Sequence, residues 1–336
     1  MTHLKMKQKV LDKIQPHSRP LIIHDNDPDG LCSGIIVKRY TDGETRRLIG
    51  RANLTLEWFN RLNMKGHAST IILDIPEVDQ DFLDTQNAVW IDHHMPLERH
   101  NVLYVNPRHY DINAYVPTTT MAQDFFGTDD TLWIAMVGSL ADYHWPHFAQ
   151  AFKSKYPDLC KHDTIQDALT KDVVGELVKM FFFLLKGERD EVEQHVRDLQ
   201  KVQSPYDILT QSTKEGKRLW KRYQKRNERF LSVLKHARSK NTRSKLLAYE
   251  YQPDTWSFTS YLANMLSTQL QGKTIIIARR DKGLMKCSCR GPNVLEAIQK
   301  VLAKVGGRGG GHPTACGASV PEDQWELFKK LLKSQL

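Results

Sequence analysis

The sequence has few cysteines, and none is placed as a stabilising cross-link would require. Five cysteines are scattered over 336 residues, an odd number without a paired CxxC spacing. A structural zinc site would need two such pairs, or one pair with two histidines. We therefore expect free thiols, no disulfide and no structural zinc. Cys287 and Cys289 alternate in an expected strand, which makes them packing residues on one face of it.

Long apolar runs are also missing. No run approaches the ~20 residues that cross a bilayer, and residues 1–20 are polar and basic, unlike a signal peptide. These features predict a cytoplasmic protein. With 40% hydrophobic and 26% charged residues, a chain of this length is expected to form two globular domains.

Positive charge is present, but it is concentrated in one place. The formal net charge is +9, and residues 214–245 hold 13 lysines and arginines against two acidic residues. The remaining chain holds 35 basic and 37 acidic residues and is close to neutral. A local basic stretch favours binding to a polyanion such as a nucleic-acid strand. The alternative is a solvated linker helix.

Short apolar runs closed by polar residues dominate the first 110 residues. Runs of this kind are typical of a parallel sheet covered on both faces, where ligands gather beyond the carboxyl ends of the strands. The pattern then becomes helical, with a long basic amphipathic helix expected at Thr213–Arg238. Mixed strands and helices follow it. The four runs are Pro20–His24, Thr70–Asp74, Ala88–Asp92 and Val102–Val105.

Carboxylates follow three of these runs. Asp27 and Asp29 come after the first, Asp74 ends the second, and Asp92–His94 ends the third; Asp142 ends an apolar helix. Clustered carboxylates repel one another unless a cation lies between them. Hard divalent cations favour such oxygens, and nearby imidazoles favour manganese-type ions over calcium. A pair of metals ~3.5–4 Å apart would need a bridging carboxylate, and this set is large enough to supply one.

A glycine-rich segment, Gly306–Thr314, lies between two expected helices near the C-terminus. Its backbone N–H groups are unobstructed by side chains and suit a loop that wraps a phosphate. Arg308 and His312 would add charge and hydrogen-bond donors. A flexible connector is the alternative interpretation.

The motifs together resemble the DHH phosphoesterase superfamily, and Gly309–His312 resembles the glycine-rich segment of its DHHA1 domain. The resemblance involves both ends of the chain. It implies an α/β protein with a parallel-sheet DHH domain that carries a helical extension, a connector helix and a smaller α/β DHHA1 domain. We expect these parts at residues 1–200, 201–240 and 241–336. The motifs in chain order are Asp27-x-Asp29-Gly30, Asp74, Asp92-His93-His94 and Asp142.

The resemblance also implies roles for single residues. Asp74 would bridge two divalent cations, with Mn²⁺ favoured and Mg²⁺ as the alternative. His94 would face the substrate phosphate, and Asp92 would orient a neighbouring ligand or a metal-bound water. One cation would be held by Asp27, Asp74 and either His24 or Asp25, and the other by Asp29, Asp74, His93 and Asp142. The implied substrate-binding residues are Ser288, Arg290, Arg308, Gly309, Gly310, Gly311 and His312.

The implied reaction is two-metal hydrolysis of phosphodiester bonds by a metal-bridging hydroxide. The basic stretch favours an exonuclease acting on single-stranded DNA or RNA, or on short oligonucleotides. A cyclic or linear dinucleotide phosphodiesterase is the alternative, since it needs little basic surface. A catalytically inactive member that binds nucleic acid or a protein partner is the third hypothesis. The choice of RNA or DNA, the polarity, the substrate length and a possible homodimer stay open.

Overall fold

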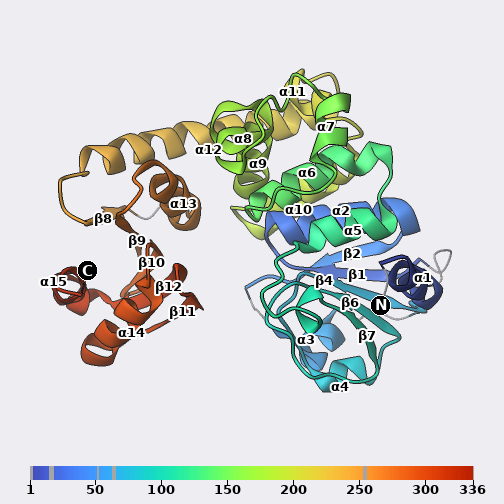
Figure 1. Cartoon of the computed structure of the whole chain (residues 1–336), viewed down its shortest axis with the longest axis horizontal. Coiled ribbons are helices and arrows are strands. Elements are labelled where there is room, and N and C mark those ends of the chain that lie inside the picture. The colour runs from blue at the N-terminus through green and yellow to red at the C-terminus, as the bar shows by residue number, and fades with distance from the viewer. Residues whose placement is uncertain (1–2, 15–18, 51–52, 63–65, 253–255, 336) are drawn as a thin grey trace. The chain divides into compact units, whose positions relative to one another are not determined.

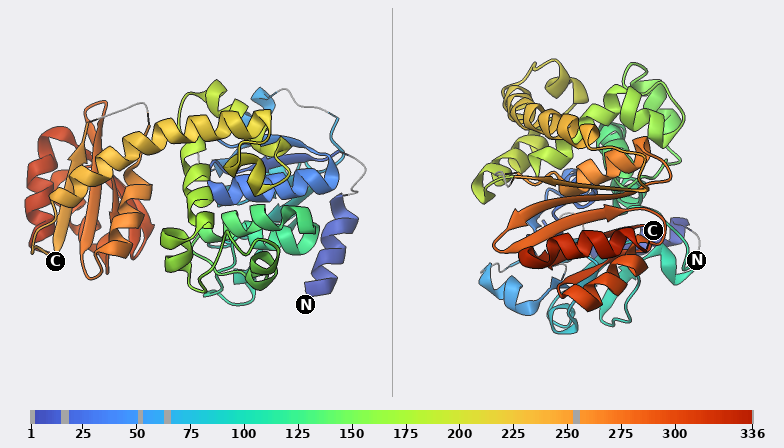
Figure 2. Two further views of the ribbon diagram at one scale, coloured as in Figure 1. Left: turned by 90° about the horizontal axis from the view of Figure 1, so that it is seen from above. Right: turned by 90° about the vertical axis from the view of Figure 1, so that its left-hand side faces the viewer.

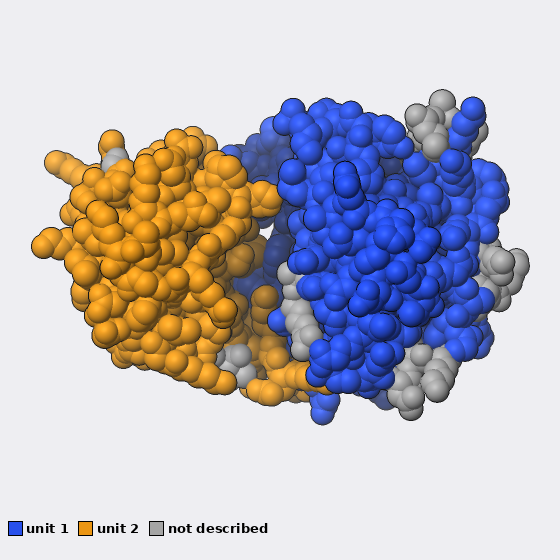
Figure 3. Space-filling model, turned by 90° about the horizontal axis from the view of Figure 1, so that it is seen from below, with its two compact units in different colours: residues 1–185, 190–220 blue, residues 186–189, 221–336 orange. Residues whose placement is uncertain are grey.

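A computed structural model describes residues 3–14, 19–50, 53–62, 66–252 and 256–335. The chain divides into two compact units. Unit 1 comprises Met1–Leu185 with Asp190–Trp220, and unit 2 comprises Lys186–Arg189 with Lys221–Leu336; Figure 3 colours them separately. Among the described helices, none is both long and apolar enough to cross a bilayer.

Unit 1 contains a five-stranded parallel sheet in the order β2-β1-β4-β6-β7. The predicted strands are confirmed; β2 was not predicted, because its sequence Glu-Thr-Arg-Arg is that of an exposed edge. The strand order reverses between β1 and β4, which makes their carboxyl ends the topological switch point. The strands are β1 (Leu21–His24), β2 (Glu44–Arg47), β4 (Thr70–Leu73), β6 (Ala88–Ile91) and β7 (Val102–Val105).

Helices cover both faces of this sheet. α2 (Pro28–Thr41) and α5 (Thr118–Phe126) lie on one face, and α3 (Leu56–Arg61) and α4 (Gln80–Leu83) lie on the other (Figure 1). The entirely buried α6 (Leu132–Ala141) packs against α2 and α5.

A glycine makes this helix packing close. A Cβ atom at Gly138 of α6 would lie 2.4 Å from Thr119 Oγ1 and 2.7 Å from Cys32 Cβ, so no larger residue fits.

The other elements of unit 1 are α1 (His3–Ile14), β3 (Asn53–Leu54), β5 (Glu77–Val78), η2 (Pro107–His109), η3 (Asp129–Thr131), α7 (Ala149–Lys155), α8 (Ile165–Lys171), α9 (Val173–Leu184), α10 (Arg189–Lys201, whose first residue falls in unit 2) and α11 (Pro205–Leu209).

The basic stretch forms α12 (Lys214–Ser239), which begins in unit 1 and ends in unit 2. The prediction of a long helix at these residues is confirmed. Leu219, Tyr223 and Phe230 are buried along one face, and most of the lysines and arginines lie on the exposed surface. The helix therefore has the amphipathic character that the sequence predicted.

Unit 2 contains a second sheet in the order β11-β12-β10-β9-β8, in which only the β8–β9 pair is parallel. Figure 2 (left) shows α14 and α15, in red, on one side of the strands and α13, in orange, on the other. The elements are β8 (Leu246–Tyr251), α13 (Thr259–Gln269), β9 (Thr274–Asp281), β10 (Leu284–Arg290), α14 (Val294–Val305), β11 (Arg308–His312), β12 (Ala315–Pro321), η4 (Glu322–Gln324) and α15 (Trp325–Lys333). The α/β class predicted for both parts of the chain is confirmed.

The glycine-rich segment is an exception to the expectations. It was predicted as a phosphate-wrapping loop, but Arg308–His312 form the edge strand β11, paired antiparallel to β12. Glycine is tolerated because the strand runs against α14: a Cβ atom at Gly309 would lie 2.9 Å from Leu302 Cδ1. All five residues of β11 are exposed, and only one side of the strand is paired.

All five cysteines are buried free thiols. Cys287 and Cys289 lie on one face of β10, with their sulfur atoms 3.7 Å apart. Their prediction as packing residues on a shared face agrees with their place in the core under α14 and α15.

Candidate metal centre

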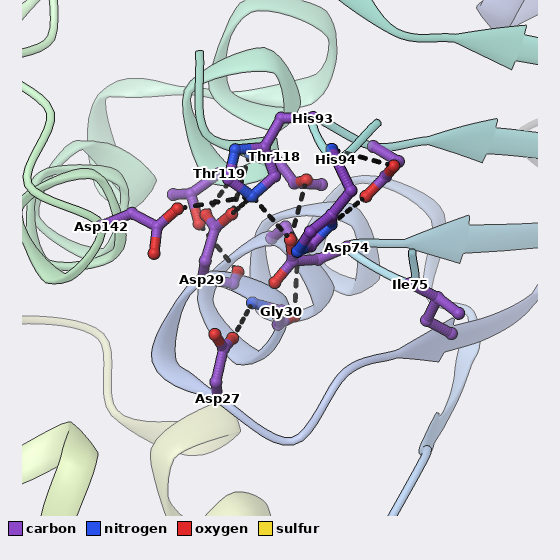
Figure 4. Close-up of polar contacts among 12 residues, drawn as sticks. Asp27, Asp29, Gly30, Asp74, Ile75, His93, His94, Thr118, Thr119 and Asp142 are labelled. Carbon is purple, nitrogen blue, oxygen red and sulfur yellow. Dashed lines mark hydrogen bonds and ion pairs between the residues drawn. The ribbon is translucent and has the colours of Figure 1, made fainter. Parts of the chain in front are cut away.

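The acidic residues converge at the switch point of the unit 1 sheet (Figure 4). Asp29, in the first turn of α2, is only 1% exposed. Its two carboxylate oxygens accept hydrogen bonds from the backbone N–H groups of Thr118 (2.9 Å) and Thr119 (2.8 Å), the first two residues of α5. The amino-terminal end of α5 therefore holds this carboxylate in place.

Asp74 directly follows β4 in a left-handed backbone conformation, with φ of 59°. Its Oδ1 accepts a hydrogen bond from the Thr118 hydroxyl at 3.3 Å. The same oxygen lies 3.3 Å from His93 Nε2. That nitrogen also lies 3.4 Å from Asp142 Oδ2 and 3.9 Å from Asp29 Oδ2. A single imidazole nitrogen thus points among carboxylates from three distant segments.

These side chains form overlapping groups with the spacing of metal ligands. Asp74 belongs to two of the groups and His93 to two, so neighbouring cation positions could share Asp74. Six of the predicted site residues are brought together in this way, including His94, which was assigned to the substrate phosphate. The groups are Asp74–His93–His94, Asp29–His93–Asp142 and Asp25–Asp27–Asp74.

Asp25, and not His24, accompanies Asp27 and Asp74 in the ligand groups found among the described residues. His24 is 1% exposed, and its Nδ1 lies 2.7 Å from the backbone oxygen of Asp25. Its ring is packed on α2, where a Cβ atom at Gly34 would lie 2.7 Å from it. Of the two alternatives left by the sequence, the geometry therefore favours Asp25.

Asp92 is fully buried and lies beneath His94. It accepts a hydrogen bond from the His94 backbone N–H at 3.1 Å, and its Oδ1 lies 2.7 Å from His94 Nδ1. The Tyr104 hydroxyl and the Asn106 amide nitrogen, both at the end of β7, donate to its other oxygen at 3.3 and 3.4 Å. Asp92 therefore fixes the orientation of the His94 ring and leaves Nε2 to face the site.

Tyr115 was not predicted, yet its hydroxyl donates to Asp142 Oδ2 at 3.0 Å, and its ring packs on His93. Arg47 was also missed: it is buried at the end of β2, hydrogen-bonds to the Asn26 side chain at 2.6 Å and pairs with Glu193 at 2.9 Å. Nothing in the sequence around these residues signals such contacts. They depend on how distant segments meet.

The electrostatics of the site fit a bound cation. Burial, reinforced by the charge of Asp27, raises the pKa of Asp29 to about 6. Burial and the neighbouring carboxylates also raise the pKa values of Asp74 and Asp142. Burial, together with the charge of His94, lowers the pKa of His93 to about 4. The raised pKa values of the carboxylates reflect negative charge that is costly to bury without a compensating cation, and the lowered pKa of His93 reflects a disfavoured positive charge on its ring.

The state of His93 supports the same interpretation. In the described part of the chain, its Nδ1 is buried without a hydrogen-bond partner, and its low pKa makes the ring neutral at pH 7. A neutral ring protonated at Nδ1 would turn the Nε2 lone pair toward carboxylate oxygens. That contact is repulsive unless a cation lies between them. The oxygen and nitrogen donors fit Mn²⁺ or Mg²⁺ chemistry.

The predicted substrate-binding residues all lie in unit 2. Arg290 on β10 is directed toward α13, where it hydrogen-bonds to the side chains of Asn264 and Ser260; Ser288 lies two residues before it. Arg308, Gly309 and Gly310 of β11 line an open cavity of about 460 Å³. Its other lining residues are Lys286, Cys287, Gly317, Ala318 and Ser319, of which Lys286 and Ser319 add polar groups that the sequence did not single out.

Residues 255–336 match the family model of the DHHA1 domain. No curated protein matches the chain significantly.

Solved structures match the whole chain at low sequence identity. RecJ from Thermus thermophilus in complex with Mn²⁺ has a TM-score of 0.68 at 14% identity, covering 99% of this chain and 54% of that one. The same protein with Mg²⁺ has a TM-score of 0.63 at 13% identity, with coverages of 99% and 52%. This chain therefore spans about half the length of that RecJ.

Two further structures match over most of their own length. An exonuclease RecJ bound to manganese has a TM-score of 0.67 at 15% identity, covering 100% of this chain and 94% of that one. PggH from Vibrio cholerae, described as a pGpG-specific phosphodiesterase, has a TM-score of 0.51 at 14% identity, with coverages of 94% and 98%. The chain shares the two-domain fold of these proteins.

Proposed function

We propose that this chain, whose residues 255–336 match the DHHA1 model and whose fold is that of solved RecJ structures, is a two-metal phosphodiesterase of the DHH/DHHA1 superfamily acting on nucleic acid. The most specific form of the proposal is an exonuclease on single-stranded DNA or RNA, or on short oligonucleotides. Residues 1–200 would hold the metals, residues 201–240 would contribute basic surface, and residues 241–336 would bind the substrate.

One observation carries the proposal: Asp74 is common to two groups of metal-ligand side chains. A carboxylate shared by two neighbouring positions is what a pair of closely spaced cations requires. A site for one structural ion would need neither the second group nor buried carboxylates whose pKa values are raised.

Asp25, Asp27 and Asp74 would hold one cation, and Asp29, Asp74, His93 and Asp142 the other. When bound, the pair would activate a water molecule and neutralise charge that develops on the phosphate. The backbone N–H groups at the start of α5 keep Asp29 in position for this role. Mn²⁺ is the favoured ion, because imidazole stands among the ligands, and Mg²⁺ is the alternative.

His94 would contact the phosphate. Burial lowers its pKa, but the hydrogen bond and the charge of Asp92 outweigh that effect, so the net shift is upward. A protonated imidazole whose Nδ1 is engaged by Asp92 presents Nε2–H as a donor to a phosphate oxygen.

A dinucleotide phosphodiesterase is the second candidate. It is favoured by the likeness to PggH, which covers 94% of this chain and 98% of that one. The basic surface of α12 favours the exonuclease, because a dinucleotide offers few phosphates for it to neutralise. An inactive, binding-only member is the third candidate, and the complete set of ligands argues against it.

The test is hydrolysis of a substrate panel by the full chain with Mn²⁺: labelled single-stranded DNA and RNA, linear dinucleotides, cyclic dinucleotides and pyrophosphate. Asp74→Asn should abolish hydrolysis, whereas the exposed carboxylate variant Asp81→Asn should not. Preference for long strands, lost at high salt, supports the exonuclease, and cleavage confined to dinucleotides supports the second candidate. No hydrolysis of any substrate, or full activity of Asp74→Asn, would overturn the proposal.

A further inference from the structure

Unit 1 contains a second cavity, separate from the ligand groups, of about 590 Å³. This open cavity is lined by α1, the end of β7 with η2, the segment before α5, α5 itself and the segment that follows Asp142. The residues that line it are Met6, Val105, Asn106, Pro107, Tyr110, Val116, Thr120, Met121, Asp124, Phe125, His144, Trp145 and His147.

The lining has the chemistry of a site for a flat, weakly polar ring. Most of it is aromatic, sulfur-containing or aliphatic, with a few amide, hydroxyl and imidazole groups among these side chains. None of the described residues that line it is a lysine or an arginine. Asp124, whose carboxylate lies 3.1 Å from His147 Nε2, is the acidic residue among the described lining residues, and Lys7, outside the lining, donates to its backbone oxygen at 2.8 Å. An anionic phosphate would therefore be disfavoured inside the cavity, and a neutral heterocycle with polar edges would be favoured.

The wall of the cavity is also part of the metal centre. Asn106 lines the cavity, and its amide nitrogen donates to the His94 backbone oxygen at 3.0 Å and to Asp92. Thr120 lines the cavity one residue after Thr119, which binds Asp29. A group held in the cavity is thus one side-chain layer away from the ligands.

We propose that this cavity binds the nucleobase of the nucleotide whose phosphate is placed at the metal centre. The inference rests on the proposed function and adds to it a site for a base. Tyr110 is 69% exposed although it lines the cavity, so its ring is available to stack on a base. The phosphate stays outside, where the cations and His94 can meet it, and the uncharged base enters.

The test compares substrates with and without a base. Trinucleotides are made with a base or an abasic tetrahydrofuran residue at each position in turn, and kcat/KM is measured with Mn²⁺. At one position, removal of the base should lower kcat/KM of the wild-type protein roughly tenfold to a hundredfold. In Tyr110→Ala, and in Val116→Trp, which fills the cavity, the ratio between base and abasic substrates should fall toward one. Ile112→Ala, on the same segment and 51% exposed but outside the lining, is the matched control.

A binding measurement without turnover distinguishes failure of the base-site proposal from failure of the phosphodiesterase proposal. In the Asp74→Asn protein with Mn²⁺, the fluorescence of a trinucleotide that contains 2-aminopurine should be quenched on binding. Adding Tyr110→Ala to this protein should reduce the quenching. Tyr110-dependent quenching without hydrolysis by wild-type protein would reject the phosphodiesterase proposal and leave the base site in place. The base site would be overturned if wild-type kcat/KM were equal for base-containing and abasic substrates at every position. It would also be overturned if the two cavity variants lowered kcat/KM equally for both kinds of substrate.

Discussion

At the scale of single residues, the candidate centre stands out by its electrostatic cost. Asp29, Asp74 and Asp142 approach one another in a buried place, and their pKa values rise as a result. Hydrogen bonds from Thr118 and Thr119 to Asp29 recover part of that cost. Under the proposed function, bound cations would offset the remainder, and the stability of the protein would then depend on metal and on pH.

The raised pKa of Asp29 determines the direction in which pH changes the stability of the protein. The pKa of an aspartate is ordinarily 3.8, and in the folded protein burial and Asp27 raise it to about 6. The folded state then binds the proton more tightly than the unfolded state does. The stability that this group contributes is therefore fully present below about pH 4 and is lost as the pH rises through about 6.

We therefore expect Mn²⁺ to stabilise the protein more at pH 7 than at pH 5, because at pH 5 protons compete for Asp29. Ligand at a hundred times its Kd adds about 2.7 kcal/mol, which is a shift of several degrees in Tm. Thermal melts in EDTA and in Mn²⁺ at both pH values measure this. Ca²⁺ and a variant with Asp29→Asn serve as controls. A shift in Tm that is equal at the two pH values would contradict the assignment of Asp29.

Tyr115 offers a second test, because its hydroxyl donates to a proposed ligand without joining the ligand groups. Tyr115→Phe keeps the ring against His93 but removes the hydrogen bond to Asp142. Loss of such a supporting contact typically weakens metal affinity about 10- to 100-fold. Calorimetric titration with Mn²⁺ measures it, with Tyr40→Phe, a partly exposed tyrosine of α2, as the control. Unchanged affinity would show that Tyr115 only fills space.

The sequence predicted the aspartates because parallel strands end at one edge of a sheet, so residues that follow β1, β4 and β6 must meet there. Tyr115 and Asn106 could not be found in this way, since their positions depend on the path of irregular segments. The choice between His24 and Asp25 was equally out of reach. The observation that favours Asp25 is the packing of the His24 ring on Gly34 of α2, a contact across the strand–helix corner.

At the scale of elements, the edge strand β11 explains why the C-terminal segment is glycine-rich. Its N–H and C=O groups on the outer side are not paired by another described strand, and a strand without side chains leaves them accessible to a phosphodiester backbone. Arg308 and Lys286 add positive charge at the cavity beside it. The strand therefore keeps the phosphate-binding potential that was predicted for a loop.

Substitutions at two neighbouring glycines of β11 test substrate binding and folding stability separately. A Cβ atom at Gly310 would have no atom within 4 Å, whereas at Gly311 (φ 138°) it would lie 2.7 Å from Ala315 O. Gly310→Ala should therefore keep its Tm and raise the KM for oligonucleotides about tenfold, by placing a methyl group on the binding surface. Gly311→Ala should lose roughly 1–3 kcal/mol of stability, measured by urea unfolding. An unchanged KM in Gly310→Ala would exclude β11 from substrate binding.

Besides the two-residue strands β3 and β5, three strands escaped prediction for a shared physical cause. β2 is charged, β11 is almost all glycine, and β12 alternates small residues, so none shows the apolar pattern of a buried strand. Each is held mainly by its partner strand: β2 by β1, and β11 by β12. Such strands are specified by tertiary pairing and not by local propensity.

At the scale of the whole molecule, charge and chemistry are divided along the chain. The candidate ligands all belong to unit 1, the strand proposed to bind phosphate belongs to unit 2, and α12 carries the excess positive charge that the sequence located. This division could be predicted because composition is additive along a chain. The arrangement of side chains within each unit could not, because it depends on packing between distant segments.

The last prediction concerns α12. Lys217, Lys221 and Lys225 are exposed on this helix, and each phosphate that a lysine neutralises on a single strand contributes about −0.7 to the slope of log K against log salt. Changing all three to glutamine should flatten that slope by roughly 2 for long single strands. Affinity at low salt should fall, and dinucleotides should be affected far less. Fluorescence anisotropy over a salt series measures both.

The matched control changes three exposed lysines elsewhere, Lys155, Lys161 and Lys171, to glutamine. It alters the net charge of the protein by the same amount but leaves α12 intact. If the two triple variants flatten the slope equally, the effect is one of overall charge and α12 is only a solvated connector. If only the α12 variant loses affinity for long single strands, the helix binds the polymer. The exonuclease is then favoured over the dinucleotide phosphodiesterase, because a substrate of two nucleotides has too few phosphates to register the loss.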